Sequence, residues 1–113
     1  MSDDCLFCRI VSGQIPARLV AQSDDCVAFR DIDPKAPVHV LVIPRRHIAS
    51  LDTLDDPTLL GRIAMMAARV ARDEGVAQSG YRTVINTGAD AGQSVSHLHM
   101  HVLGGRQLKW PPG

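Results

Sequence analysis

Three histidines alternate with apolar residues near the end of the chain, in the run His97-Leu98-His99-Met100-His101-Val102-Leu103. This alternation predicts a β-strand, because successive side chains of a strand point to opposite faces of a sheet. Leu98, Met100 and Val102 would then pack against a core, and the three imidazoles (the triad) would share the other face, about 7 Å apart. Stacked imidazoles offer no packing advantage over threonine or valine, so the pattern indicates a functional site.

Two chemistries suit three histidines on one face of a strand. A His-x-His pair can supply two ligands to one metal ion. Alternatively, a neutral imidazole can act as a nucleophile, oriented by the group that its other nitrogen bonds. The spacing by itself does not separate these two interpretations.

The remaining hydrophobic pattern predicts an α+β domain built from strands and one long helix. The helix is expected over Pro57–Glu74, because Asp56 can cap its start and Gly75 suits a left-handed exit. Its apolar stripe consists of Leu59, Ile63, Met66, Ala67 and Val70. The predicted strands are Arg18–Gln22, Cys26–Arg30, His39–Ile43, Tyr81–Asn86 and His97–Leu103, and their short links suit antiparallel pairing. Cys5–Gly13 fits either one or two helical turns or a strand.

Length and composition restrict the class of protein. The 113 residues, 45% of them hydrophobic, fit one domain that spans residues 1–113. Twelve basic and twelve acidic residues leave no net charge, which argues against a non-specific nucleic-acid binder. The acidic start, Met1 to Asp4, is unlike a signal peptide, and no apolar run is long enough to cross a membrane. We therefore expect a cytoplasmic protein with no membrane association.

A glycine-rich segment, Gly88–Ser94, precedes the triad. Backbone N–H groups of such a turn can surround an anion, and the Ser94 hydroxyl adds a donor. The segment lacks the Gly-Lys-Ser/Thr ending of a P-loop, so that motif is excluded. Beside three histidines, it predicts a phosphate-binding loop.

The three cysteines are too few for a complete disulfide framework, which fits a reducing compartment. The pair Cys5-x-x-Cys8 is compatible with a redox pair, half a zinc site or two buried thiols. Because no second pair exists, a zinc site would need His47 and one triad histidine. Cys26 lies in an apolar strand and is expected in the core.

Several segments taken together cover almost the whole chain. Besides the triad they are Phe29–Ile48 (FRDIDPKAPVHVLVIPRRHI), Tyr81–Gly88 (YRTVINTG), Gly92–His97 (GQSVSH) and the ending Gly104–Gly113 (GGRQLKWPPG). In this combination the chain resembles the histidine-triad (HIT) superfamily, specifically its Hint branch of purine nucleoside phosphoramidases. The resemblance implies a five-stranded antiparallel sheet with one long and one short helix. It also implies a homodimer with a continuous ten-stranded sheet, in which Trp110 would lie near the partner's active site.

The reaction that the resemblance implies is hydrolysis of purine nucleoside 5′-phosphoramidates through a covalent nucleotidyl-histidine. His99 would be the nucleophile, oriented by the backbone carbonyl of His97. His39 would support it and His101 would contact the phosphate oxygens. The other implied roles are phosphate binding by Asn86, Gly92 and Ser94, protonation of the leaving amine by Ser94, ribose binding by Asp31, and a base pocket of Leu6, Phe7, Ile10, Phe29 and Ile32. Imidazole is the side chain suited to such work near pH 7.

The N-terminal cysteine pair departs from many animal Hint proteins, which lack it. Bacterial members and the related hexose-1-phosphate uridylyltransferases use such a pair, with a downstream histidine and the first triad histidine, to hold structural zinc. By position, the resemblance implies Zn²⁺ bound by Cys5, Cys8, His47 and His97, with no open coordination position. No metal would be required for the catalytic step.

Three other interpretations stay open at this point. One is a dinucleoside polyphosphate hydrolase of the same superfamily, although the Trp110 ending and the GQSVSH segment favour the Hint branch. Another is a zinc-stabilised nucleotide-binding or scaffolding protein whose catalysis is vestigial. The last makes the triad itself a catalytic metal site.

Overall fold

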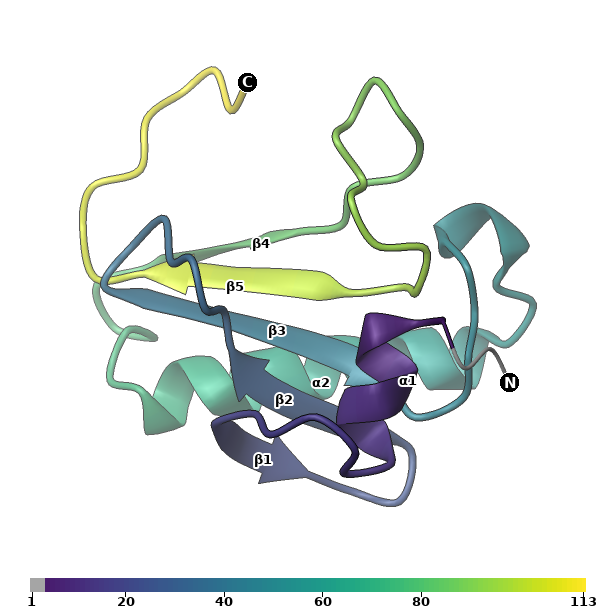
Figure 1. Cartoon of the computed structure of the whole chain (residues 1–113). Helices are drawn as coiled ribbons and strands as arrows, with labels where there is room; N and C mark the ends of the chain where they lie inside the picture. Colours follow the sequence, from purple (N-terminus) through teal and green to yellow (C-terminus); the bar gives the residue numbers. More distant parts are fainter. Residues whose placement is uncertain (1–3) are drawn as a thin grey trace.

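The computed structural model describes residues 4–113, so Met1 to Asp3 of the acidic start lie outside the described residues. Five strands form one sheet in the order β1-β2-β3-β5-β4, and every neighbouring pair is antiparallel (Figure 1). The elements are α1 (Leu6–Val11), β1 (Leu19–Gln22), β2 (Cys26–Arg30), β3 (Val38–Pro44), a 3-10 turn (Leu51–Thr53), α2 (Pro57–Asp73), β4 (Tyr81–Val84) and β5 (Met100–Gly104). The expected α+β fold is confirmed. Within the described residues, no helix combines the length and apolarity needed to cross a membrane.

The long helix α2 forms where the end signals and the apolar stripe of the sequence coincide. The Asp56 carboxylate accepts a hydrogen bond from the backbone N–H of Leu59 at 3.2 Å, and Gly75 leaves the helix with a φ of +77°. The buried residues of the helix are Leu59, Ile63, Met66, Ala67, Val70 and Ala71. The predicted stripe is confirmed, and the helix ends at Asp73, one residue earlier than predicted.

Strand boundaries agree with the sequence prediction to within two residues, except at the start of β5. This strand begins at Met100, so the prediction of a strand over His97–Leu103 is wrong for its first three residues. Continuing the β3–β5 register past Met100 would set Leu98 opposite Pro44. Proline has no N–H to donate, so the ladder ends there. The N–H of Leu98 instead bonds the carbonyl of Ile48 at 2.6 Å.

The sheet has one helix on each face (Figure 1). On the α2 face, Leu98, Met100 and Val102 belong to the larger core cluster, as the alternation predicts. Cys26 is fully buried in the same cluster, which confirms it as a core thiol. On the α1 face, a smaller cluster gathers around Phe7, whose ring contacts two of the triad imidazoles. The triad therefore faces α1.

Candidate functional site

Two cysteines and two histidines from distant parts of the chain meet on the α1 face. They are Cys5, Cys8, His47 and His97, and their sulfur and ring nitrogen ligand atoms all lie within 4.8 Å of one another. Sγ of Cys5 is 3.3 Å from Nδ1 of His97, and Sγ of Cys8 is 3.3 Å from Nδ1 of His47. Of the two structures expected for the N-terminal segment, the helix is observed, and it holds both thiols near the two imidazoles.

The donor set of this cluster fits a closed, four-coordinate metal site. Zn–S bonds of about 2.3 Å and Zn–N bonds of about 2.0 Å would place sulfur and nitrogen ligands roughly 3.5 Å apart. The observed sulfur–nitrogen distances are 3.3 to 3.6 Å. Nε2–H of His97 donates to the carbonyl oxygen of Pro44 at 2.9 Å, which leaves Nδ1 with a lone pair for a metal. Burial lowers the pKa of His97, so the ring favours the neutral form that coordination needs.

The central triad histidine is oriented by the backbone of the first. Nδ1–H of His99 donates to the carbonyl oxygen of His97 at 2.7 Å. A carbonyl can only accept, so the ring proton of a neutral His99 lies on Nδ1 and Nε2 keeps its lone pair. The bond expected from the sequence is therefore present, and the ring is 5% exposed.

His39 contacts the third triad histidine, not the second. Its Nε2 lies 2.9 Å from Nδ1 of His101 and 3.4 Å from a carboxylate oxygen of Asp31. The rings of His101 and His99 are in turn 5.1 Å apart between centroids, which is closer than the 7 Å expected from strand rise. The contact observed for His39 is thus with His101, and its supporting role beside His99 stays a prediction.

Burial keeps the imidazoles of His39 and His101 neutral. It lowers the pKa of His101 to about 4, and the neighbouring rings of His99 and His39 add to the shift. Burial also lowers the pKa of His39, although the carboxylate of Asp31 acts in the opposite direction. At neutral pH each ring therefore has one N–H and one lone pair, so the hydrogen bond between them has a direction.

A cavity of about 310 Å³ opens beside these histidines. The predicted site residues that line it are Leu6, Phe7, Ile10, Phe29, Asp31, Ile32, Ser94, His99 and His101. The sequence prediction missed Ile15, Pro16, Ala17, Arg30, Leu41 and Val95. Strand alternation could have found Leu41, which lies two residues from His39 in β3. The other five carry no comparable pattern.

Four predicted catalytic or substrate-binding residues are not among those that line this cavity: His39, described above, and Asn86, Gly92 and Trp110. Asn86 is half-buried and Gly92 is exposed, both in the β4–β5 connection, and neither lines the cavity. Trp110 is 79% exposed, and its ring centroid lies 5.9 Å from the guanidinium carbon of Arg82. Within the described chain, these residues are therefore outside the cavity that the histidines line.

The glycine-rich loop is closed by its own hydrogen bonds. The N–H of Gly88 donates to the side-chain oxygen of Gln93 at 3.0 Å, and the N–H of Gly92 donates to the carbonyl of Ala89 at 3.0 Å. The N–H groups of Gly88 and Gly92 thus already have hydrogen-bond partners within the loop, and phosphate binding by this segment stays a prediction. Ser94, at the end of the loop, does line the cavity.

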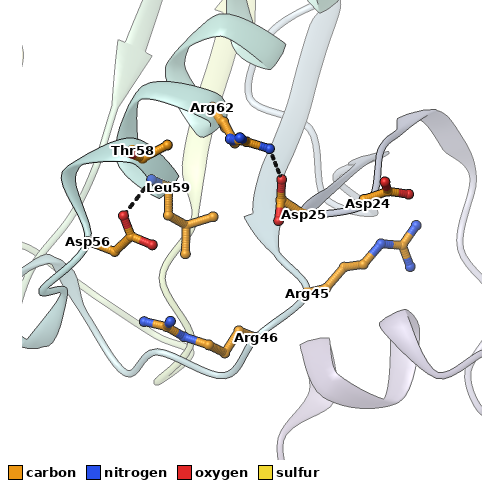
Figure 2. A pocket seen from close by; sticks show the side chains of 8 residues that line it. All are labelled: Asp24, Asp25, Arg45, Arg46, Asp56, Thr58, Leu59 and Arg62. Carbon is orange, nitrogen blue, oxygen red and sulfur yellow. Dashed lines mark hydrogen bonds and ion pairs between the residues drawn. The ribbon is translucent and has the colours of Figure 1, made fainter.

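A second cavity, of about 380 Å³, lies near the start of α2 (Figure 2). Its lining consists of Asp24, Asp25, Arg45, Arg46, Asp56, Thr58, Leu59 and Arg62. Arg62 forms an ion pair with Asp25, and Asp56 caps α2. Three arginines and three aspartates cancel in formal charge, and no predicted site residue lies here. The histidine cavity is therefore the candidate site.

Comparison with known proteins identifies the family. The family model of the HIT domain matches residues 12–108. The chain belongs to the HIT domain family. An uncharacterized HIT-like protein of Synechococcus elongatus is 51% identical over 115 residues, and the match covers 100% of both chains.

Solved HIT structures share the fold closely. A HIT family hydrolase from Legionella pneumophila Philadelphia 1 superposes with a TM-score of 0.95 at 47% identity, covering 97% of this chain and 100% of that one. A histidine triad nucleotide-binding protein from Candida albicans superposes with a TM-score of 0.83 at 30% identity, covering 96% and 83% of the two chains. The fold of this HIT protein is thus that of HIT family hydrolases.

Proposed function

We propose that this HIT protein is a Hint-type hydrolase of purine nucleoside 5′-phosphoramidates, with His99 as the nucleophile. The observation that carries the proposal is the 2.7 Å bond from Nδ1 of His99 to the carbonyl of His97. It leaves Nε2 as the lone-pair nitrogen of a ring that lines the cavity. The names of the hydrolase from Legionella and the nucleotide-binding protein from Candida support the reaction type and the ligand class.

The cavity lining suggests how the substrate lies. The base would rest on the apolar wall formed by Leu6, Phe7, Ile10, Phe29 and Ile32, and the carboxylate of Asp31 would accept from the ribose hydroxyls. The α-phosphate would then lie between His99, His101 and Ser94. Asn86 and Gly92 would reach the phosphate from the β4–β5 connection, which must move for this to happen because neither residue lines the cavity.

The chemistry proceeds in two displacements. Nε2 of His99 forms a bond to the α-phosphorus as the P–N bond breaks, and the leaving nitrogen takes a proton from solvent through the exposed hydroxyl of Ser94. The phosphorylated ring is then cationic, and the carbonyl of His97 stabilises its Nδ1–H. Water next attacks phosphorus and loses a proton to solvent, the Nε2–P bond breaks, and a nucleoside monophosphate leaves with neutral His99 restored. His101 donates to the phosphoryl oxygens in both steps.

The same proposal assigns Zn²⁺ to Cys5, Cys8, His47 and His97. When bound, zinc would supply a rigid cross-link between α1, the β3–α2 connection and the triad. The zinc would not touch substrate, because its four protein ligands leave no open position. All three cysteines are buried and none forms a disulfide, which supports the proposal of a reducing, cytoplasmic location.

The proposal includes a homodimer in which the tail of one chain serves the other chain's site. Trp110 is largely exposed and does not line the cavity of its own chain. The guanidinium Nη2 of Arg82 donates to the backbone carbonyl oxygen of Lys109 at 3.0 Å, which holds the tail beside β4, a strand at one edge of the sheet. An edge strand has unpaired backbone groups that a second copy can satisfy.

The deciding experiment measures turnover and the covalent intermediate together. The protein is mixed with an adenosine 5′-phosphoramidate or, separately, with a diadenosine polyphosphate. We expect release of AMP from the amidate, and an intact-protein mass gain of one adenylyl group. His99→Asn should lose the adduct and at least about 1,000-fold in turnover, while the exposed Gln78→Ala control keeps both. Faster turnover of the polyphosphate, or AMP binding without any turnover, would reject the phosphoramidase in favour of one of the alternatives.

A further inference from the structure

A backbone amide of the β2–β3 loop points at the histidine that supports His101. The N–H of Lys35 donates to Nδ1 of His39 at 3.0 Å. An amide nitrogen can only donate, so Nδ1 must accept and the ring proton of neutral His39 must lie on Nε2. With that proton in place Nε2 has no lone pair for a metal ion. The group formed by Asp31, His39 and His101, whose ligand atoms are close together, is therefore a hydrogen-bond relay.

The proton on Nε2 of His39 sets the state of the next ring. Nε2 lies 2.9 Å from Nδ1 of His101 and 3.4 Å from the Asp31 carboxylate, so the imidazole is its nearer acceptor. Nδ1 of His101 then accepts, and its own proton lies on Nε2, available to a phosphoryl oxygen in the cavity. With the opposite tautomer of His39, His101 would present a lone pair to that oxygen and repel it. The Lys35 amide therefore decides whether His101 attracts or repels the phosphate.

The loop that carries this amide is held by the turn after β5. Nη2 of Arg106 donates to the carbonyl oxygen of Lys35 at 2.8 Å. Gly105, with a φ of +92°, packs so closely on the loop that an added Cβ would lie 2.9 Å from Cβ of Pro37. The side chain of Arg106 therefore holds the carbonyl of Lys35, in the peptide group that follows the N–H bonded to His39, and the glycine permits the close packing of the turn on the loop.

We propose that the Lys35 amide, braced by Arg106, is a positioning group that locks the tautomer of His39 and so makes His101 a donor to the phosphoryl group. This inference rests on the proposed function for its catalytic consequence, but the lock itself is a property of the free protein. Lys35 and Arg106 are exposed and their side chains do not line the cavity, so both can be altered without removing a group that touches the substrate.

The first arm of the test reads the tautomer directly. Long-range ¹H–¹⁵N NMR of protein labelled with ¹⁵N-histidine distinguishes protonated from unprotonated ring nitrogens at pH 7. We expect the proton of His39 on Nε2 in the wild type and in Lys35→Ala, which keeps the backbone N–H. Lys35→Pro removes that N–H and should yield a mixture of tautomers or the Nδ1–H form. A wild-type His39 protonated on Nδ1, or a folded Lys35→Pro protein with an unchanged tautomer, would overturn the lock.

The second arm measures kcat and KM with an adenosine 5′-phosphoramidate. Lys35→Pro should lower kcat about 100-fold with little change in KM, because a donor to the reacting phosphate is lost, whereas Lys35→Ala should resemble the wild type.

If Lys35→Pro does not fold, Arg106→Gln decides, with Lys109→Gln as its charge-matched control. Arg106→Gln should shift part of the tautomer population and lower kcat, and no change in either would overturn the bracing. A tautomer shift without a change in kcat would overturn the catalytic consequence. An inactive wild type would reject the proposed function, while the NMR arm still decides the lock.

Discussion

The ring of Phe7 lies edge-on against the imidazole of His99, with centroids 5.2 Å apart and planes at 88°. Phe7 lies between Cys5 and Cys8 in the sequence, and these two thiols contact His97 and His47. The cysteine cluster and the histidine cavity therefore share a wall of packed atoms. Phe7 and the carbonyl of His97 lie between the cluster and the proposed nucleophile, and both contact His99.

Loss of a metal ligand should destabilise the whole domain. Cys8→Ser removes one of four donors, and we expect zinc content to fall from one ion per chain to none. The melting temperature should fall by about 10 °C or more, because a structural metal contributes folding free energy directly. Metal analysis and calorimetry measure the two effects. Cys26→Ala is the control, since this thiol is buried outside the cluster and its loss should leave zinc in place; full zinc occupancy in Cys8→Ser would contradict the assignment.

Acid should destabilise the protein through His101. Its pKa is lowered to about 4 in the folded state, chiefly by burial, whereas an unfolded histidine titrates near about 6.5. Between these two pKa values the unfolded chain binds more protons than the folded protein. The free energy of unfolding is therefore unaffected by this group above about pH 6.5 and decreases as the pH falls toward about 4. Protonation of His101 accounts for a loss of up to about 3 kcal/mol in the free energy of unfolding. Urea unfolding at several pH values should show a flatter dependence in His101→Gln, and an NMR titration of His101 with a midpoint near 6.5 would contradict the prediction.

The ion pair between Arg30 and Glu74 should contribute measurably to stability. Both guanidinium nitrogens bond the carboxylate, at 2.5 and 3.0 Å, and the side chains are 34% and 18% exposed. We expect Glu74→Gln to lower the free energy of unfolding by about 1 kcal/mol, because a bidentate, half-buried pair keeps more of its energy than an exposed one. Asp73→Asn is the matched control, since its pair with Arg69 is exposed on both sides. If both substitutions lowered the free energy of unfolding equally, the bidentate geometry and the partial burial of the Arg30–Glu74 pair would contribute no extra stability.

Two glycines should respond to alanine in opposite ways. Gly105→Ala places Cβ 2.9 Å from Cβ of Pro37 at a φ of +92°, so we expect a loss of about 2 kcal/mol or more. Gly61 lies in α2 with nothing within 4 Å of an added Cβ. Gly61→Ala should therefore stabilise the protein by about 0.5–1 kcal/mol through helix propensity. Denaturant unfolding measures both, and a harmless Gly105→Ala would contradict the close packing of this turn on the β2–β3 loop.

The sequence predicted the elements of the fold because their signals are local. The cap at Asp56, the exit at Gly75 and the apolar stripe between them define α2. The alternation of Leu98, Met100 and Val102 with histidines correctly sorted the two faces of the triad run. The predicted start of β5 was wrong for a non-local reason, because the residue that ends the hydrogen-bond ladder is Pro44, which lies on β3. The sequence likewise did not show that the N–H groups of Gly88 and Gly92 bond partners within their own loop.

The sequence by itself determined which residues are the candidates for chemistry, because residue type and motif spacing can be read along the chain. Cys5, Cys8 and the histidines could be named without coordinates. Only the tertiary structure decided which ring nitrogen of each histidine carries the proton, since the hydrogen-bond partners of these nitrogens come from other parts of the fold. Nδ1 of His99 meets a carbonyl, Nδ1 of His39 meets an amide, and Nε2 of His39 meets the ring of His101. A donor or acceptor opposite a nitrogen sets its tautomer, and no spacing in the sequence specifies that partner.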